Sequence, residues 1–197
     1  MKTILTGFIF GLLTLGACNN PQPKSDAAQQ ESQPEMAADE ESSADEDSKS
    51  ERPSPPRKAT GTLGDMSVEI NYSSPKVKGR SIWGGLVPYG EVWRTGANEA
   101  TTISFSKTAL VEGKKLAAGK YSLFTIPGEE KWTVIFNSVA EQWGAYEYDK
   151  SKDALRVEVT PRAIDEHVES MEFIVADGKV TLRWEKLEVP VSVATAE

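Results

Sequence analysis

Apolar side chains occupy every second position in several stretches of this 197-residue chain, and that spacing is the period of a β-strand. Met66, Val68, Ile70 and Tyr72 alternate with polar residues, and residues 101–107 repeat the pattern. No stretch keeps a helical period for more than a turn or two. The alternation therefore predicts an all-β fold, either an antiparallel β-sandwich or a jelly-roll-like barrel.

Turn sequences join two pairs of the predicted strands. Two runs that are apolar on both faces, residues 122–126 and 132–136, flank a turn that contains proline and glycine, so we expect a hairpin in the middle of the sheet. The pair Asp177-Gly178 separates two alternating runs and is the strongest hairpin signal in the chain. Beyond it the apolar positions shift by one residue, and a β-bulge near Lys186 would return them to the core.

Residues 19–59 differ in composition from the rest of the chain, because they contain no Trp, Phe, Tyr, Leu, Ile or Val. Such a segment buries too little apolar surface to offset the entropy of ordering it. We therefore expect residues 18–59 to form a disordered acidic tether that ends in a stiff, proline-rich, polyproline-like stretch. Residues 60–197 would then form a single β-sandwich domain.

Residues 1–17 resemble the signal peptide of a bacterial lipoprotein. Lys2 precedes a short apolar stretch, and two small residues precede Cys18, which is the only cysteine. The apolar stretch is shorter than the roughly 20 residues that a membrane-spanning helix needs. The resemblance implies lipidation of Cys18, a membrane anchor and a place in the bacterial cell envelope. Asn19 stands where an aspartate would mark retention in the inner membrane, which favours the outer membrane.

Charge and histidine content argue against several functions. The net charge is −8, and the chain has no basic stripe with interleaved aromatic residues, so we do not expect nucleic acid as a partner. The single histidine, His167, leaves one possible base for nucleophilic catalysis, and no serine lies in a nucleophile-elbow motif. We expect no metal at residues 165–169 and no cofactor, and we favour a protein that is not an enzyme.

Five motifs stand out between residues 78 and 144: KGRSIWGGLVP at 78–88, VWRTGANEAT at 92–101, GKYSLFTIP at 119–127 and WTVIFN at 132–137, followed by QWG at 142–144. They resemble a family of secreted and lipid-anchored bacterial envelope proteins known only as the domain of unknown function numbered 2911. The resemblance covers most of residues 66–162 and implies an envelope location and a β-rich fold, without an established reaction.

The candidate ligand site lies in residues 74–101, a stretch with too many glycines for a strand and too many aromatics for a disordered loop. We expect an ordered loop that folds back over the core. Arg94, Asn98 and Glu99 on this loop can converge on one polar ligand, and Arg80 can join them.

Tryptophans could complete this site. Trp83, Trp93 and Trp143 offer flat apolar faces on which sugars stack, and Trp132 is a further candidate. The alternative is structural: Arg94 and Glu99 would form an ion pair that holds the loop, while the tryptophans fill the sandwich core.

Three functions remain open. The first is non-catalytic binding of a small polar or glycan ligand by a membrane-anchored envelope lipoprotein. The second is a structural or assembly role in the envelope. The third is glycan hydrolysis by a pair of carboxyl groups, for which Glu99 with Glu91, Glu141 or Glu147 are the candidates.

Overall fold

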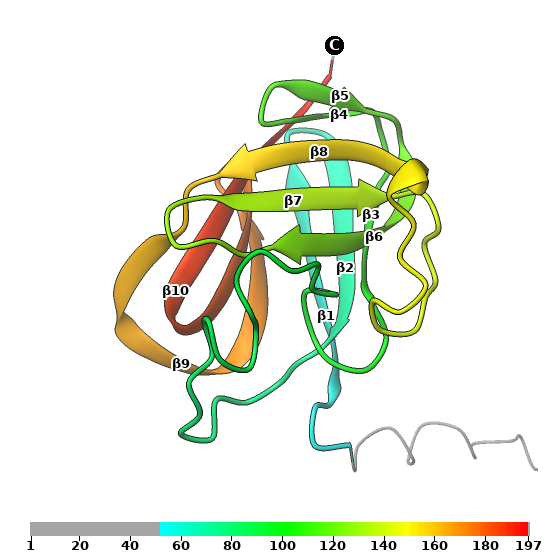
Figure 1. Cartoon of the computed structure of the whole chain (residues 1–197). Helices are drawn as coiled ribbons and strands as arrows, with labels where there is room; N and C mark the ends of the chain where they lie inside the picture. Colours follow the sequence, from blue (N-terminus) through cyan, green and yellow to red (C-terminus); the bar gives the residue numbers. More distant parts are fainter. Residues whose placement is uncertain (1–51, 197) are drawn as a thin grey trace, which may run out of the picture. The chain divides into compact units, whose positions relative to one another are not determined.

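The computed structural model describes residues 52–196, which form two antiparallel β-sheets packed face to face (Figure 1). The six-stranded sheet has the order β1 (Pro56–Leu63), β2 (Met66–Ser73), β3 (Thr101–Phe105), β6 (Gly119–Ile126), β7 (Trp132–Asn137) and β8 (Asp153–Val159). The four-stranded sheet has the order β5 (Lys114–Leu116), β4 (Ala109–Val111), β10 (Lys179–Thr195) and β9 (Arg162–Ala176). The sheets do not close into a barrel, so the predicted all-β sandwich is confirmed.

Regular helix is almost absent from the part of the chain that the structure describes. It contains one turn of 3-10 helix, Lys150–Lys152, and no α-helix. Within residues 52–196, no helix has the length and apolarity needed to cross a membrane.

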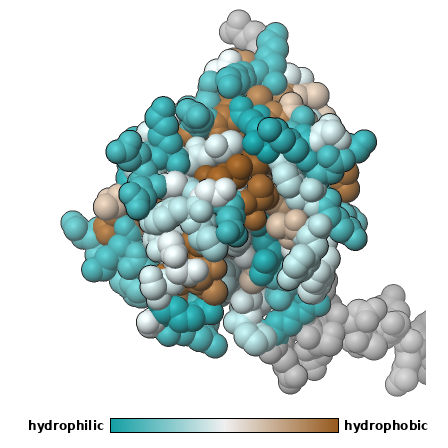
Figure 2. All heavy atoms as spheres, viewed as in Figure 1, coloured by the Kyte–Doolittle hydropathy of each residue, from teal (hydrophilic) through white to brown (hydrophobic). Residues whose placement is uncertain are grey.

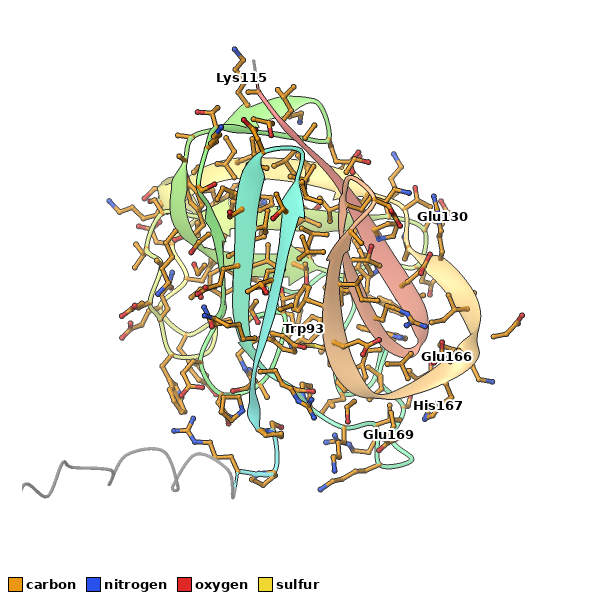
Figure 3. The ribbon with its side chains drawn as sticks, turned by 180° about the vertical axis from the view of Figure 1, so that it is seen from behind. Trp93, Lys115, Glu130, Glu166, His167 and Glu169 are labelled. Atoms are coloured by element: carbon orange, nitrogen blue, oxygen red, sulfur yellow. The ribbon has the colours of Figure 1, made fainter. Side chains whose placement is uncertain are left out.

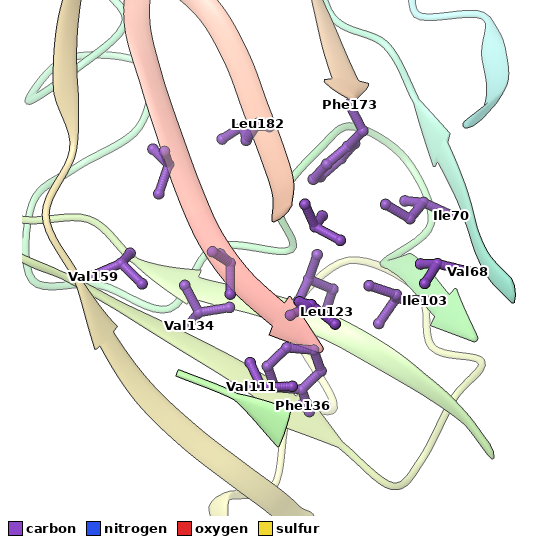
Figure 4. Close-up of a cluster of buried hydrophobic side chains, with 14 of the residues drawn as sticks. Val68, Ile70, Ile103, Val111, Leu123, Val134, Phe136, Val159, Phe173 and Leu182 are labelled. Atoms are coloured by element: carbon purple, nitrogen blue, oxygen red, sulfur yellow. The ribbon is translucent and has the colours of Figure 1, made fainter. Parts of the chain in front are cut away.

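The core lies between the two sheets and is built by the predicted alternation. Met66, Val68 and Ile70 on β2 are each no more than 1% exposed, whereas Ser67 between them faces solvent. Figure 4 shows how side chains from both sheets, among them Ile103 and Phe173, meet in this cluster. The period-two pattern in the sequence thus identifies which face of each strand is buried.

The predicted hairpin between β6 and β7 lies inside the six-stranded sheet and is buried on both faces. Leu123 and Phe136 face the main core, while Phe124 and Ile135 form a second, smaller core on the opposite face with Ala100. Figure 2 shows hydrophobic residues near the centre of the face turned to the viewer, over β6 and β7. The two strands are apolar on both faces because each face packs in a different hydrophobic core.

The hairpin β9–β10 also forms as predicted. Asp177 and Gly178 both have positive φ values, 51° and 70°, which a two-residue turn between right-twisted strands requires. The register of β10 against β9 shifts between Arg183 and Leu187, and Glu185 in this stretch has a φ of 57°. Side chains on both sides of the shift are buried, so the predicted bulge is confirmed.

The ordered domain begins earlier than predicted. Strand β1 starts at Pro56 and pairs with β2 over its whole length, although residues up to 59 were expected to belong to the tether. The amino-acid composition did not reveal this strand, because β1 is an edge strand that pairs through its backbone and buries few side chains. A proline is tolerated at the first position of such a strand. The predictions for residues 1–51, including Cys18, lie outside the described residues.

Residues 74–100 form the ordered loop that the sequence predicted. The loop connects β2 to β3 and runs along one end of the sandwich, at the bottom of Figure 1. Val77, Ile82 and Val87 are at most 3% exposed and belong to the main core. Buried apolar residues spaced along the loop thus hold it against the two sheets.

Candidate functional site

Four tryptophans pack together between the sheets and the 74–100 loop. The Trp83 ring lies edge-on to those of Trp132 and Trp184, with centroids 5.0 and 5.7 Å away. The Trp93 ring stacks on Trp184 at 6.0 Å, and Figure 3 shows Trp93 between the two sheets. Trp132 and Trp184 are each 1% exposed. Trp83 and Trp93 therefore pack as part of the core. For these two residues the structure agrees with the structural interpretation and not with a role in stacking on a sugar.

The turn that carries the predicted polar residues is closed by its own hydrogen bonds. The Thr101 backbone N–H donates to Arg94 O at 3.2 Å, and Thr101 Oγ1 donates to Thr95 O at 2.7 Å. Thr95 and Asn98 both adopt left-handed backbone conformations, with φ values of 55° and 56°. These hydrogen bonds and backbone conformations fix the path of the turn, and with it the directions in which the side chains of Asn98 and Glu99 leave the backbone.

Glu99 pairs with Arg52 and not with Arg94. Arg52 Nη1 lies 2.6 Å from Glu99 Oε1, and Ser73 Oγ donates to Glu99 Oε2 at 3.2 Å. Asn98 Nδ2 donates to Ser54 O at 3.3 Å. The Arg94–Glu99 ion pair of the structural alternative is therefore wrong, because the segment before β1 supplies the cation. Within residues 52–196, the buried Nε of Arg94 has no hydrogen-bond partner.

Arg80 lies apart from this group. Its Nε donates to Val77 O at 3.1 Å, and its Nη2 donates to Lys76 O. The guanidinium thus binds the backbone of its own loop, and Arg80 does not join Asn98 and Glu99.

An open groove with a volume of 740 Å³ lies across the outer face of the six-stranded sheet, over β1, β2 and β3. Its lining comes from these strands, from the residues before β1 and before β3, from the start of β6 and from the loop that follows β7. The lining residues are Arg52, Pro56, Arg57, Lys58, Asn71, Tyr72, Ser73, Glu99, Ala100, Thr102, Lys120, Glu141, Gln142, Trp143 and Glu147.

The floor of the groove is a row of polar side chains set by strand register. Lys58 pairs with Asn71 across β1 and β2, and Asn71 pairs with Thr102 across β2 and β3. These residues alternate with Ile70 and Ile103, which point into the main core. The floor is therefore the solvent face of the same strands that build the core.

One wall of the groove is formed by residues 141–143 and Glu147, and buried polar contacts hold this segment on the sheet. Gln142 Nε2 donates to Val139 O at 2.7 Å and lies 3.2 Å from both Ser122 Oγ and Asn137 Oδ1. Gln142, Ser122 and Asn137 are all at least 92% buried. Since buried polar groups hold their partners tightly, the wall has a fixed position.

Trp143 stands at the edge of this wall with 57% of its surface exposed. Its backbone is fixed next to Glu99 by an antiparallel bridge, in which Ala100 N–H donates to Gln142 O at 3.0 Å and Gly144 N–H donates to Asn98 O at 3.2 Å. The groove thus combines one exposed aromatic ring with amide, hydroxyl and carboxylate groups.

Hydrogen-bonded ion pairs hold two of the carboxyls that line the groove, those of Glu99 and Glu141, in the charged form. Burial raises the pKa of Glu99, but the hydrogen bond and charge of Arg52 outweigh this, so the pKa lies below its ordinary value. The hydrogen bond from Lys120 Nζ, at 2.9 Å, lowers the pKa of Glu141. Both carboxyls are therefore ionised at neutral pH.

The structure brings Glu99 and Trp143 together in the groove and places Asn98 behind its end, while Arg80, Trp83, Trp93 and Arg94 lie outside its lining. Sequence reasoning missed Arg52, Asn71, Thr102, Lys120 and Gln142. A signal existed for Asn71 and Thr102, because they occupy outward positions of two predicted strands. Only the strand order shows that these positions are neighbours.

The acidic stretch around His167 lies on β9, and Figure 3 places Glu166, His167 and Glu169 along the outer side of that strand. His167 Nε2 lies 3.2 Å from Glu169 Oε2, and both side chains are exposed. Among residues 52–196, no group of three or more His, Cys, Asp or Glu side chains has the arrangement of a metal site.

Comparison with known proteins identifies one family. A family model described as a protein of unknown function, DUF2911, matches residues 54–193. No curated protein and no solved structure matches the chain.

Proposed function

The chain belongs to the DUF2911 family, whose description assigns no activity, and we propose from the geometry of the groove that it binds a small polar or glycan ligand without catalysis. The observation that carries this proposal is the position of Trp143. Its exposed ring borders a groove whose floor bears Asn71 and Thr102 and whose end bears Glu99. A large exposed aromatic side chain beside convergent polar groups is typical of ligand sites.

A glycan matches this combination of groups. One face of a sugar ring carries C–H groups that stack on an aromatic ring, and its hydroxyls exchange hydrogen bonds with amides, hydroxyls and carboxylates. Trp143 supplies the ring, and Asn71, Thr102 and Glu99 supply both donors and acceptors. The backbone bridge beside Glu99 holds the Trp143 backbone in place before a ligand arrives, which reduces the entropic cost of binding.

The groove is poorly suited to glycan hydrolysis. That reaction needs one carboxyl group that is protonated near neutral pH, which requires a raised pKa. The pKa values of Glu99 and Glu141 are instead lowered by Arg52 and Lys120. Of the remaining candidates, Glu147 lines the groove and Glu91 does not. Binding therefore explains the environment of Glu99 and Glu141 better than hydrolysis does.

A purely structural or assembly role explains only part of the observations. It accounts for Trp83 and Trp93, which pack with the core, and for Glu99, which secures Arg52. It gives no reason for an exposed Trp143, because burial of that ring is not needed for the fold.

The proposal places the binding domain on a lipid anchor. Lipidated Cys18 would attach the chain to the bacterial envelope, and residues 19–51 would serve as the tether. Asn19, which follows the cysteine, favours the outer membrane over the inner. Labelling cells with a fatty-acid analogue tests the anchor. Label is expected on the wild-type protein and lost from Cys18→Ala, and label that persists on this variant would contradict the anchor.

A calorimetric titration of the full-length chain with a panel of soluble envelope glycans and small polar metabolites tests the binding function. We expect Trp143→Ala to weaken binding by about tenfold or more, which corresponds to about 1.4 kcal/mol. Tyr146→Ala is the matched control, because Tyr146 is 89% exposed and does not line the groove. Equal loss in both variants, or no binding by the wild type, would contradict the proposal.

A further inference from the structure

A second hollow of 580 Å³ lies on the same outer face of the six-stranded sheet. Its lining consists of short polar side chains and backbone on β1, β2 and β3, with a contribution from the start of β6. The lining residues are Thr60, Gly61, Thr62, Ser67, Val68, Glu69, Ser104, Phe105, Ser106, Gly119 and Lys120.

The two hollows are parts of one surface. Lys120 lines both of them. In the second hollow Thr60 pairs with Glu69, and Glu69 pairs with Ser104, one outward row further along the strands than the groove floor. Adjacent outward rows on the same three strands leave a continuous polar surface that runs along β2.

The charges on this surface are largely paired with one another. Lys58 Nζ lies 2.8 Å from Glu69 Oε2, and Lys120 Nζ lies 2.9 Å from Glu141 Oε1. Because the cations and carboxylates already satisfy each other, a charged polymer gains little by displacing these partners. Thr60 and Ser104 flank Glu69 in the strand register, and their hydroxyls suit an uncharged partner rich in hydroxyl groups.

The length of the surface exceeds that of one sugar ring. Asn71 and Ser67 on β2 are four residues apart, which corresponds to about 13 Å along a strand. Trp143 stands beyond the Asn71 end. We propose that the ligand is a linear, uncharged oligosaccharide that lies along β2, with one end at Trp143 and several sugars over the second hollow. This inference rests on the proposed glycan-binding function and adds the size and charge class of the ligand.

Calorimetry with oligosaccharides of increasing length tests this inference on the full-length chain. The probes are glucose oligomers with β-1,4 and α-1,4 linkages and N-acetylglucosamine oligomers, each as monomer, dimer, tetramer and hexamer. We expect at least one series to bind about tenfold more tightly as the tetramer than as the monomer. Equal affinity of monomer and tetramer in every series that binds would overturn the inference, as would tighter binding of dextran sulfate than of the neutral tetramer.

Two double variants test whether the second hollow causes the dependence of affinity on oligosaccharide length. Thr60→Ala with Ser104→Ala removes two hydroxyls from the second hollow, and Thr133→Ala with Thr181→Ala is the matched control outside both hollows. The first double variant should weaken tetramer binding several-fold and leave monomer binding unchanged, whereas the control should bind both normally.

The Trp143→Ala variant and the second-hollow variant together show whether only the oligosaccharide proposal fails or the proposed binding function fails as well. If Trp143→Ala weakens binding of every length but the second hollow has no effect, the ligand is small and only the inference fails. If no sugar binds, or if Trp143→Ala binds all lengths like the wild type, the proposed function fails and the inference fails with it.

Discussion

Single residues at the end of the groove serve both the fold and the site. Glu99 accepts hydrogen bonds from Arg52 and Ser73, and it also lines the groove beside Trp143. The side chains of Arg52 and Glu99 are 35% and 45% exposed, so water screens their attraction. The pair therefore positions the carboxylate more than it stabilises the domain.

Glu99→Gln should lower the free energy of unfolding by no more than about 1 kcal/mol at neutral pH. The pKa of Glu99 is lower in the folded state than in the unfolded state, so its contribution is present above the unfolded pKa and is lost as the pH falls through the folded pKa. Urea denaturation of wild type and variant from neutral to acidic pH checks this. If the difference in unfolding free energy between wild type and variant grew as the pH fell, the assigned ion pair would be contradicted.

Gly96→Ala should destabilise the turn by about 1–3 kcal/mol. A Cβ atom at this position would lie 2.9 Å from Thr101 Oγ1 and 3.2 Å from Ser73 O, which is closer than carbon and oxygen normally approach. Thermal denaturation in a double-mutant cycle provides the test. The cost of Gly96→Ala should be smaller in a Thr101→Ala background, and equal costs in both backgrounds would show that the turn is looser than described.

At the scale of elements, the sequence predicts strands well where one face is buried. The alternation in Met66–Tyr72 and the Asp177-Gly178 turn depend only on neighbouring residues, and both predictions are confirmed. Strand β1 has almost no alternating apolar residues, because it is held by backbone pairing with β2. Such a strand leaves little signal in its own sequence.

The candidate site was only partly predictable from the sequence, because part of it depends on how distant strands pair. Trp143 and Glu99 were selected as chemically suitable side chains, and the structure places both in the groove. Asn71 and Thr102 face each other only because β2 and β3 pair in one particular register across a loop of 27 residues, numbered 74–100. Local patterns contain no information on that register.

The β9–β10 hairpin should depend on the left-handed conformation of its turn. Gly178 has a φ of 70°, so Gly178→Ala should cost about 1 kcal/mol of unfolding free energy. Asp177→Asn is the control, since asparagine also adopts this conformation readily and should leave stability nearly unchanged. Urea denaturation measures both, and an unaffected Gly178→Ala variant would mean that the turn is not the type described.

At the scale of the whole molecule, the domain is complete only with β1. This strand pairs with β2 in eight positions, packs against β9 of the other sheet and borders the groove. It therefore joins the N-terminal part of the described residues to both sheets.

A chain that starts at residue 52 should unfold cooperatively, whereas a chain that starts at residue 60 should be less stable by more than about 2 kcal/mol. The shorter chain loses four of the eight β1–β2 pairs, those of Pro56, Arg57, Lys58 and Ala59. Thermal denaturation followed by circular dichroism makes the comparison. Equal melting of the two chains would show that the domain begins at residue 60, as composition alone suggested.

Binding of a glycan beside Trp143 can be followed by the indole N–H signals of the five tryptophans in a two-dimensional NMR spectrum. Titration with the tightest-binding oligosaccharide should shift the signal of Trp143, assigned from the spectrum of Trp143→Phe. The signals of Trp83, Trp93, Trp132 and Trp184 should stay in place, because these rings pack with the core. Shifts confined to these four signals, with that of Trp143 unmoved, would contradict binding beside Trp143.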